Sequence, residues 1–240
     1  MVHTDFLTYT DKFIVMLGSP SLADGRDAEE WYLKEHTARV LEDKKVRRYI
    51  ANVSNKAYDE AIAKIFDASF AKTGGMANPW ASVAFVDEIY APEWTEISYL
   101  YNDLPVLGVF GVTEYHVRQL ITDRPLGTKD PEIKRICIVT KPDFMSHDEA
   151  VSYQILEHPA KCFVHHSGMA CYTQNHVNDY IVPGPSTVDN FTILHFWNLD
   201  AIRFGMFSQP DSRRVISEDC NHFRSTTWPI HVDQYIMKAN

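Results

Sequence analysis

The chain contains an internal repeat in which equivalent residues lie 122 positions apart (158 − 36 = 122). Residues 13–41 align without a gap with residues 135–163, and most aligned positions keep their physical character. A largely apolar segment, a proline, an aromatic residue and a Glu-His pair recur in that order. The pair is Glu35-His36 in the first copy and Glu157-His158 in the second. A single repeat of this length indicates duplicated supersecondary structure, so the fold should consist of two similar halves.

The first half is predicted to contain strands and helices in an alternating order. Apolar runs predict strands at 13–17, 46–53 and 82–86, and the alternating pattern of 112–120 predicts a fourth. Helices are expected at 25–42 and 92–100. A further amphipathic helix at 56–72, followed by a Gly74-Gly75 loop, has no counterpart in the second half. We interpret residues 54–80 as an insertion.

The second half repeats the pattern. Strands are expected at 135–139, 169–176, 191–197 and 230–237, and helices at 147–163 and 211–219. Ser146-x-x-Glu149 is a capping-box sequence, which marks the start of the first of these helices. Each half is therefore a ferredoxin-like β-α-β-β-α-β unit.

A single ferredoxin-like unit leaves one face of its sheet uncovered, and two units packed sheet to sheet solve this problem. We therefore predict an α+β protein in which two tandem repeats form a pseudo-dimeric α+β barrel. The first repeat should span residues 1–122 and the second 135–240, joined by a linker at 123–134 that is rich in Asp, Pro, Gly and Lys.

Composition excludes several classes of partner. The net charge of −9 and the pI of about 5.6 argue against binding to nucleic acid or to an anionic membrane. No apolar run approaches the ~20 residues needed to cross a bilayer. The N-terminus lacks a signal-peptide pattern, and the four cysteines form no Cys-x-x-Cys pair. These features predict a cytoplasmic protein with reduced thiols and no metal site.

His36 and His158 are the candidate catalytic residues that the repeat selects. Residues four apart share a helix face, so His158 should lie beside Gln154 and Cys162, towards a pocket between helix and sheet. An imidazole titrates near neutral pH and can act as base and then as acid. The alternative is that both histidines are buried structural residues kept by the duplication.

Several short motifs resemble the EthD family of the dimeric α+β barrel superfamily. These are Trp31-x-x-x-Glu35-His36 in the first half and Tyr153-x-x-x-Glu157-His158-Pro159 in the second. The second half adds a Tyr-x-Gln-Asn segment at 172–175, an aromatic strand at 191–197 and the stretch from Pro210 to Phe223. The last stretch is similar to the end of fungal decarboxylases that act on anthraquinone-type acids. The first half departs from the pattern, because no proline follows His36.

The resemblance implies a cofactor-independent lyase or cyclase that decarboxylates, cyclises or dehydrates an aromatic, polyketide-derived small molecule in secondary metabolism. His158 would be the principal acid/base and His36 its weaker counterpart. Tyr172, Asn175 and His195 would stabilise a developing oxyanion. Aromatic side chains would stack on the substrate rings, and we assign this role to Trp31, Tyr49, Tyr153, Phe191 and Trp197. Asp219 and His222, near a helix end, are interpreted as capping or surface groups.

Other functions remain open at this point. A barrel that binds a hydrophobic metabolite or scaffolds a biosynthetic partner without catalysis is the main alternative. The superfold also includes haem proteins with a proximal histidine. His165-His166 could contribute to a metal site with His158, although no zinc-binding motif accompanies them. The protein could be a monomer, since the repeat supplies the usual pairing within one chain, or a homodimer.

Overall fold

The computed structural model describes residues 7–22, 25, 27–66, 76–119 and 124–239. Eight antiparallel strands form a closed barrel in the order β1-β3-β2-β8-β5-β7-β6-β4. The first-half strands are β1 (Leu7–Leu17), β2 (Arg48–Ser54), β3 (Phe85–Tyr90) and β4 (Val106–Arg118). The second-half strands are β5 (Ile133–Thr140), β6 (Met169–Val182), β7 (Asn190–Phe196) and β8 (Thr226–Lys238).

The two halves have the same strand order. Within the barrel the first half reads β4-β1-β3-β2 and the second reads β8-β5-β7-β6, which is the same ferredoxin-like arrangement. The halves join where β2 pairs with β8 and where β4 pairs with β6. The predicted pseudo-dimeric α+β barrel is therefore confirmed.

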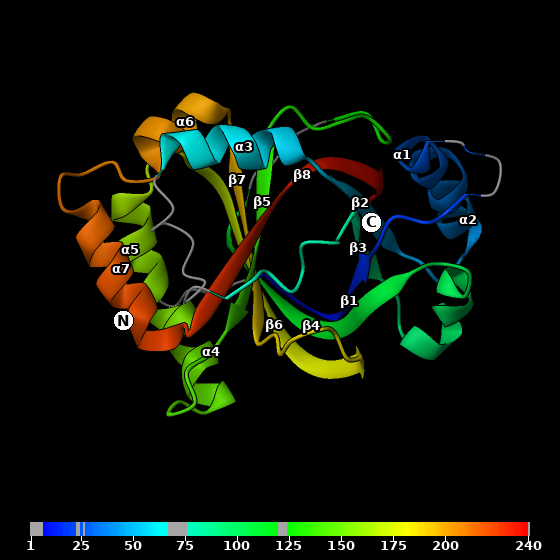
Figure 1. The fold of residues 1–240 in the computed structure, drawn as a ribbon. Helices are drawn as coiled ribbons and strands as arrows, with labels where there is room; N and C mark the ends of the chain where they lie inside the picture. The colour runs from blue at the N-terminus through cyan, green and yellow to red at the C-terminus, as the bar shows by residue number, and fades with distance from the viewer. Residues whose placement is uncertain (1–6, 23–24, 26, 67–75, 120–123, 240) are drawn as a thin grey trace.

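Apart from α3, the helices of the two halves lie on opposite sides of the barrel (Figure 1). In the first half, α1 (Ala28–Trp31), a π-helical segment η1 (Tyr32–His36) and α2 (Thr37–Glu42) follow one another without a break. In the second half, α4 (His147–Leu156), α5 (His158–His165) and α7 (Ser212–Phe223) lie at the other end. Above the barrel in this view lie α3 (Lys56–Ile65) and α6 (Leu199–Gly205).

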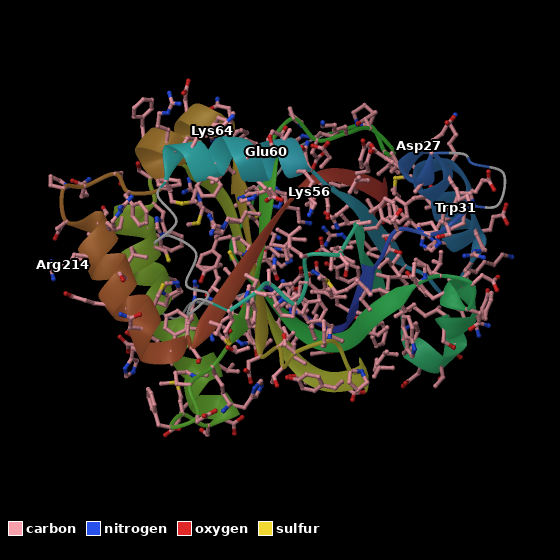
Figure 2. All side chains as sticks on the ribbon, viewed as in Figure 1. Asp27, Trp31, Lys56, Glu60, Lys64 and Arg214 are labelled. Carbon is pink, nitrogen blue, oxygen red and sulfur yellow. The ribbon has the colours of Figure 1, made fainter. Side chains whose placement is uncertain are left out.

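Side-chain caps fix several helix starts. The Asp27 carboxylate accepts the backbone N–H of Glu30, Asn55 caps α3 and Asn198 caps α6. The predicted capping box of Ser146 and Glu149 is present at α4. Figure 2 shows Asp27 and Trp31 at the first-half helices and Arg214 on α7 at the far side.

Some predicted elements need correction. The helix expected at 92–100 is instead two short 3₁₀ turns, η3 (Trp94–Glu96) and η4 (Ser98–Tyr101). The helix expected at 147–163 is divided at Glu157, just before Pro159, whose ring cannot continue an unbroken helix. The strand expected at 82–86 begins only at Phe85, and α6 was not predicted.

The expected helix 56–72 ends at Ile65, and the Gly74-Gly75 loop lies outside the described residues. β5 begins at Ile133, inside the predicted linker.

The barrel interior has an apolar part and a charged part. Because side chains alternate along a strand, Lys12, Ile14 and Met16 of β1 face inwards, as do Lys134, Ile136 and Ile138 of β5. The isoleucines and Met16 belong to a buried cluster with Phe110 and Phe191. Both lysines are also buried, and each is paired with Glu88. None of the helices in the described parts of the chain is long and apolar enough to span a bilayer.

Candidate functional site

A cavity of about 370 Å³ lies outside the barrel, between the sheet of the second half and its helices. Its floor consists of outward-facing residues of β5, β6, β7 and β8, including Arg135, Tyr172, Thr192 and Leu194. Its walls come from α5 and α7 and from Met206 and Phe207, which follow α6. The volume falls in the range of small-molecule sites, roughly 300–1,000 Å³.

The break between α4 and α5 positions His158 at this cavity. Glu157 ends α4, and Pro159 occupies the first turn of α5, where its missing N–H costs no hydrogen bond. His158 is the first residue of α5 and is almost fully buried against the sheet. Cys162, four residues later, lies on the same helix face and also lines the cavity.

Asp219 of α7 holds the His158 ring. His158 Nδ1 lies 2.5 Å from Asp219 Oδ2, and both side chains are buried. The other carboxylate oxygen of Asp219 accepts hydrogen bonds from the Tyr153 hydroxyl, at 2.5 Å, and from the Lys161 ammonium. Burial alone would raise the pKa of Asp219, but the hydrogen bonds from His158, Lys161 and Tyr153 lower it well below its usual range.

These contacts make His158 a neutral base. Burial lowers the pKa of His158 to about 4, although the hydrogen bond to Asp219 opposes this change, and the ring is therefore uncharged at neutral pH. An ionised carboxylate only accepts hydrogen bonds, so Nδ1 carries the ring proton and its N–H donates a hydrogen bond to Asp219. Nε2 then carries the lone pair. The groups nearest to Nε2 are Cys162 Sγ at 3.1 Å and Arg224 Nη2 at 3.4 Å.

The remaining cavity wall is both cationic and polarisable. Three guanidinium groups line it, from Arg135, Arg213 and Arg224. The thiols of Cys137, Cys162 and Cys220 line it as well, together with the aromatic rings of Tyr172 and Phe207. Positive charge beside apolar and aromatic surface suits a flat ligand that carries a carboxylate or phenolate.

The equivalent region of the first half is filled by tyrosine side chains. His36 is buried, and its Nε2 lies 2.8 Å from Asp87 Oδ2. Asp87 also accepts hydrogen bonds from the hydroxyls of Tyr32, Tyr49 and Tyr101. In the strand register Asp87 corresponds to Thr192, which lines the second-half cavity. His36 lines neither this cavity nor the interior cavity described below.

The structure brings only some of the predicted site residues together. His158 and Tyr172 line the same cavity, with their rings 6.2 Å apart. Asn175 and Phe191 lie on the opposite face of the sheet, inside the barrel, where the Asn175 amide donates to the Phe191 carbonyl. His195 also faces the interior. Tyr172 and Asn175 are three residues apart on one strand, so they point to opposite faces.

The predicted stacking residues are dispersed. Tyr153 binds Asp219 behind His158 but does not line the cavity. Tyr49 is buried and donates to Asp87, and Trp31 is half-buried, with its ring stacked on His36 at 6.2 Å. Trp197 is on the surface with 52% of its area exposed. Among the five stacking residues, only Tyr153 contacts the His158–Asp219 pair.

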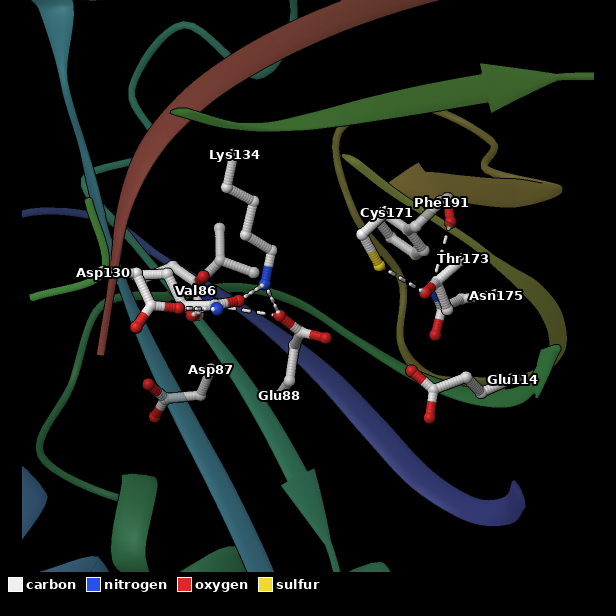
Figure 3. A network of polar contacts seen from close by, with 12 residues as sticks. Val86, Asp87, Glu88, Glu114, Asp130, Lys134, Cys171, Thr173, Asn175 and Phe191 are labelled. Atoms are coloured by element: carbon white, nitrogen blue, oxygen red, sulfur yellow. Dashed lines mark hydrogen bonds and ion pairs between the residues drawn. The ribbon is translucent and has the colours of Figure 1, made fainter. Parts of the chain in front are cut away.

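His195 belongs to a smaller interior cavity of about 170 Å³, which is lined by charged residues of both halves. Figure 3 shows Glu88 and Lys134 in contact there, and Glu114 and Cys171 nearby. Burial lowers the pKa of His195 to about 3, so this ring is neutral. His195 is thus separated from His158 by the sheet.

Asp219 is a candidate site residue that the sequence analysis did not assign to the site. Its interpretation as a capping or surface group is wrong, because it is buried and binds His158, Tyr153 and Lys161. Its position four residues before Phe223, on the inner face of an amphipathic helix, was the available signal. His222 is exposed.

The arrangement at His158 does not suit a metal or a haem iron. Among the described residues, no three His, Cys, Asp or Glu side chains are placed to hold a metal ion. A histidine that binds a metal usually donates its other ring N–H to a carboxylate, a backbone carbonyl or water, and Asp219 would fill this position. Such a histidine also needs an open second nitrogen, and here Cys162 and the Arg224 cation stand at Nε2. Repulsion between that guanidinium and iron opposes ligation.

Comparisons with known proteins support the fold. The sequence matches no protein-family model, and the search of curated proteins found no match. Among solved structures, an anthrone oxidase-like protein aligns with a TM-score of 0.55 at 9% identity, over 97% of this chain and 98% of that one. A chlorite dismutase variant from Candidatus Nitrospira defluvii aligns with a TM-score of 0.53 at 9% identity, over 98% and 93%. This chain shares the dimeric α+β barrel fold with them, and its resemblance to the EthD family stays a prediction.

Proposed function

We propose that this protein is an enzyme that moves protons on an aromatic, acidic small molecule bound in the second-half cavity. The observation that carries the proposal is the buried His158–Asp219 pair at the cavity wall, in which the Nε2 lone pair is the base. A base next to three guanidinium groups can remove a proton from a phenol or an activated C–H while the cations hold the resulting anion.

The motifs and the cavity together support the proposed reaction class. A cofactor-independent decarboxylation, cyclisation or dehydration of a polyketide-derived compound needs one base that later returns the proton. The fold shared with an anthrone oxidase-like protein supports a polycyclic aromatic substrate. An anthrone is a suitable test compound, because it has an acidic ring C–H that a base can remove. The alternative is a non-catalytic barrel that binds such a compound without changing it. This alternative predicts measurable binding but no turnover.

Proton exchange tests the base directly. Anthrone in D₂O should exchange its ring C–H for deuterium faster with the protein than without it, as followed by NMR. His158→Ala should lower that acceleration by about 10²–10⁴-fold, the usual contribution of a general base. His222→Ala, an exposed histidine on α7, is the matched control and should leave it unchanged.

A second assay uses 1-hydroxy-2-naphthoic acid and similar phenolic acids, with carbon dioxide release and product formation measured by chromatography. Exchange that persists in a folded His158→Ala variant would contradict the proposal. Tight binding of these compounds with neither exchange nor turnover would favour the non-catalytic barrel.

A further inference from the structure

Three side chains at the cavity form a nucleophile–base–carboxylate relay. Cys162 Sγ lies 3.1 Å from His158 Nε2, and His158 Nδ1 lies 2.5 Å from Asp219 Oδ2. Covalent catalysis by cysteine requires this order, in which a thiol contacts a base and a third group orients that base. Cys162 and His158 both line the cavity, so a bound molecule can reach the thiol.

The geometry points to Cys162 as a nucleophile that accepts an acyl group from an activated aromatic ester or thioester. This activity goes beyond the proposed proton transfer, although it uses the same histidine. The substrate class follows from the cavity, whose aromatic and apolar wall fits an aryl group and whose arginines attract acidic substituents.

The acyl transfer balances with the groups present. The Cys162 sulfur attacks the carbonyl carbon while its proton passes to His158 Nε2, and Asp219 stabilises the imidazolium. The tetrahedral oxyanion collapses, and the C–O or C–S bond to the leaving group breaks as His158 protonates that group. Water then attacks the Cys162 thioester with His158 as base, which releases the carboxylic acid and restores the thiol. The net reaction is hydrolysis, with no oxidant or reductant.

Arg224 is placed to stabilise the oxyanion. Its Nη2 lies 3.4 Å from His158 Nε2, the same nitrogen that the Cys162 sulfur approaches, and its guanidinium lines the cavity. A fixed positive charge where negative charge develops is a large source of transition-state stabilisation.

The resting state of the thiol sets the expected pH behaviour. Burial raises the pKa of Cys162 and outweighs the opposing charge of Arg224, so the thiol is protonated at neutral pH. Cys162 therefore depends on His158 to remove its proton during the attack. Acylation should accordingly require neutral His158 and should not follow the titration of an exposed thiol.

The test uses 4-nitrophenyl benzoate as the acyl donor with the full-length protein. We expect a burst of one equivalent of 4-nitrophenolate per chain, and one added benzoyl group on the Cys162 peptide after acid quench and mass spectrometry. Cys162→Ala should abolish both signals. Cys171→Ala is the matched control, because that buried thiol faces the interior cavity, and it should keep them.

His158→Asn and Asp219→Asn separate a relay from a merely reactive thiol. Each should slow the burst by at least about 10²-fold while leaving Cys162 present. Near-UV circular dichroism checks that each variant is folded, and Cys162→Ser supplies a second variant of nearly unchanged volume, which should also lose the burst.

The outcomes distinguish this inference from the proposed function. The inference is wrong if no burst occurs, if benzoyl is found on a residue other than Cys162, or if Cys162→Ala retains the burst. If the Cys162→Ala variant keeps the full 4-nitrophenolate burst and still accelerates anthrone exchange, the acyl-transfer inference is wrong and the proposed proton-transfer function stands. If His158→Ala keeps the exchange but Cys162 is still acylated in the wild type, the proposed function alone fails.

Discussion

At the scale of single residues, one repeat position has two different environments. His36 and His158 are equivalent, yet Asp87 of strand β3 binds the first and Asp219 of helix α7 binds the second. Asp87 also accepts hydrogen bonds from three tyrosine hydroxyls, and these tyrosine side chains fill the space over the sheet of the first half. In the second half Thr192 takes the place of Asp87 in the register, and the corresponding space is a cavity. This contrast is why we propose that the chemistry takes place in the second half.

The Asp219 carboxylate sets the orientation and tautomer of His158. Its removal should therefore lower the rate of proton exchange more than the affinity for the ligand. Asp219→Asn keeps the volume but replaces an acceptor oxygen by an amide that can donate to Nδ1, which favours the wrong tautomer. We expect turnover of anthrone exchange to fall by about 10²–10⁴-fold with ligand affinity changed far less. Glu218→Gln, the exposed neighbour on α7 paired with Arg214, is the control. Equal losses in both variants would contradict this role.

The repeat and helix spacing predicted that His158 faces a pocket with Cys162 beside it, and both side chains line the second-half cavity. The catalytic role of His158 stays a prediction. Asp219 could not be assigned in this way, because its contact with His158 joins residues 61 positions apart, on helices whose packing the sequence does not determine. The grouping of Tyr172 with Asn175 and His195 failed for a simpler reason. Strand alternation places Asn175 and His195 inside the barrel.

At the scale of elements, strand positions were predictable and several helices were not. The strands carry strong apolar runs and pair in the expected order. The η3 and η4 turns occupy a segment that is only nine residues long from Trp94 to Asn102, in which tertiary packing outweighs a weak helical pattern. Helix α6 escaped prediction because it is seven residues long and begins directly after an aromatic strand.

Helix α6 depends on a glycine contact with the turn that precedes β6. A Cβ atom on Gly205 would lie 2.4 Å from the Cα of Gly168 in this turn, so alanine at position 205 must push the helix away from the turn. Gly205→Ala should lower the free energy of unfolding by about 1–3 kcal/mol in urea titration. Met206 and Phe207 would move with the helix, so ligand affinity of the cavity should also fall. Gly18→Ala, whose nearest contact would be an ordinary 3.5 Å, should change stability little. A stable Gly205→Ala protein would contradict the close packing.

At the scale of the whole molecule, the repeat extends to the charged interior. Lys12 and Lys134 are equivalent by the same 122-residue offset (134 − 12 = 122), and both bind the single carboxylate of Glu88. Lys12 also binds Glu114 of β4, and Lys134 binds Gln234 at the corresponding place on β8. The network therefore crosses from one half to the other, and Glu88 is its centre. Figure 3 shows its contact with Lys134.

Glu88 should accordingly stabilise the barrel as one unit. Burial alone would raise its pKa, but the charges of Lys12 and Lys134 hold it well below the usual 4.5. A carboxyl group whose pKa is lower in the folded than in the unfolded state contributes stability above the unfolded pKa and loses it as the pH falls below that value. Glu88→Gln leaves two buried ammonium groups with less counter-charge and should cost about 3–5 kcal/mol near pH 7.

Urea unfolding of wild type and Glu88→Gln at pH 7 and at about pH 3 tests this prediction. The difference between the two proteins should be large at pH 7 and smaller at the acidic pH, because only the wild type loses the contribution of an ionised Glu88 as the pH falls. Glu96→Gln is the control, since that carboxylate is 41% exposed and lies 3.6 Å from Lys45, and it should change stability by less than about 1 kcal/mol at either pH. A Glu88→Gln protein as stable as the wild type at pH 7 would show that the two halves are held together by strand pairing and apolar packing without this network.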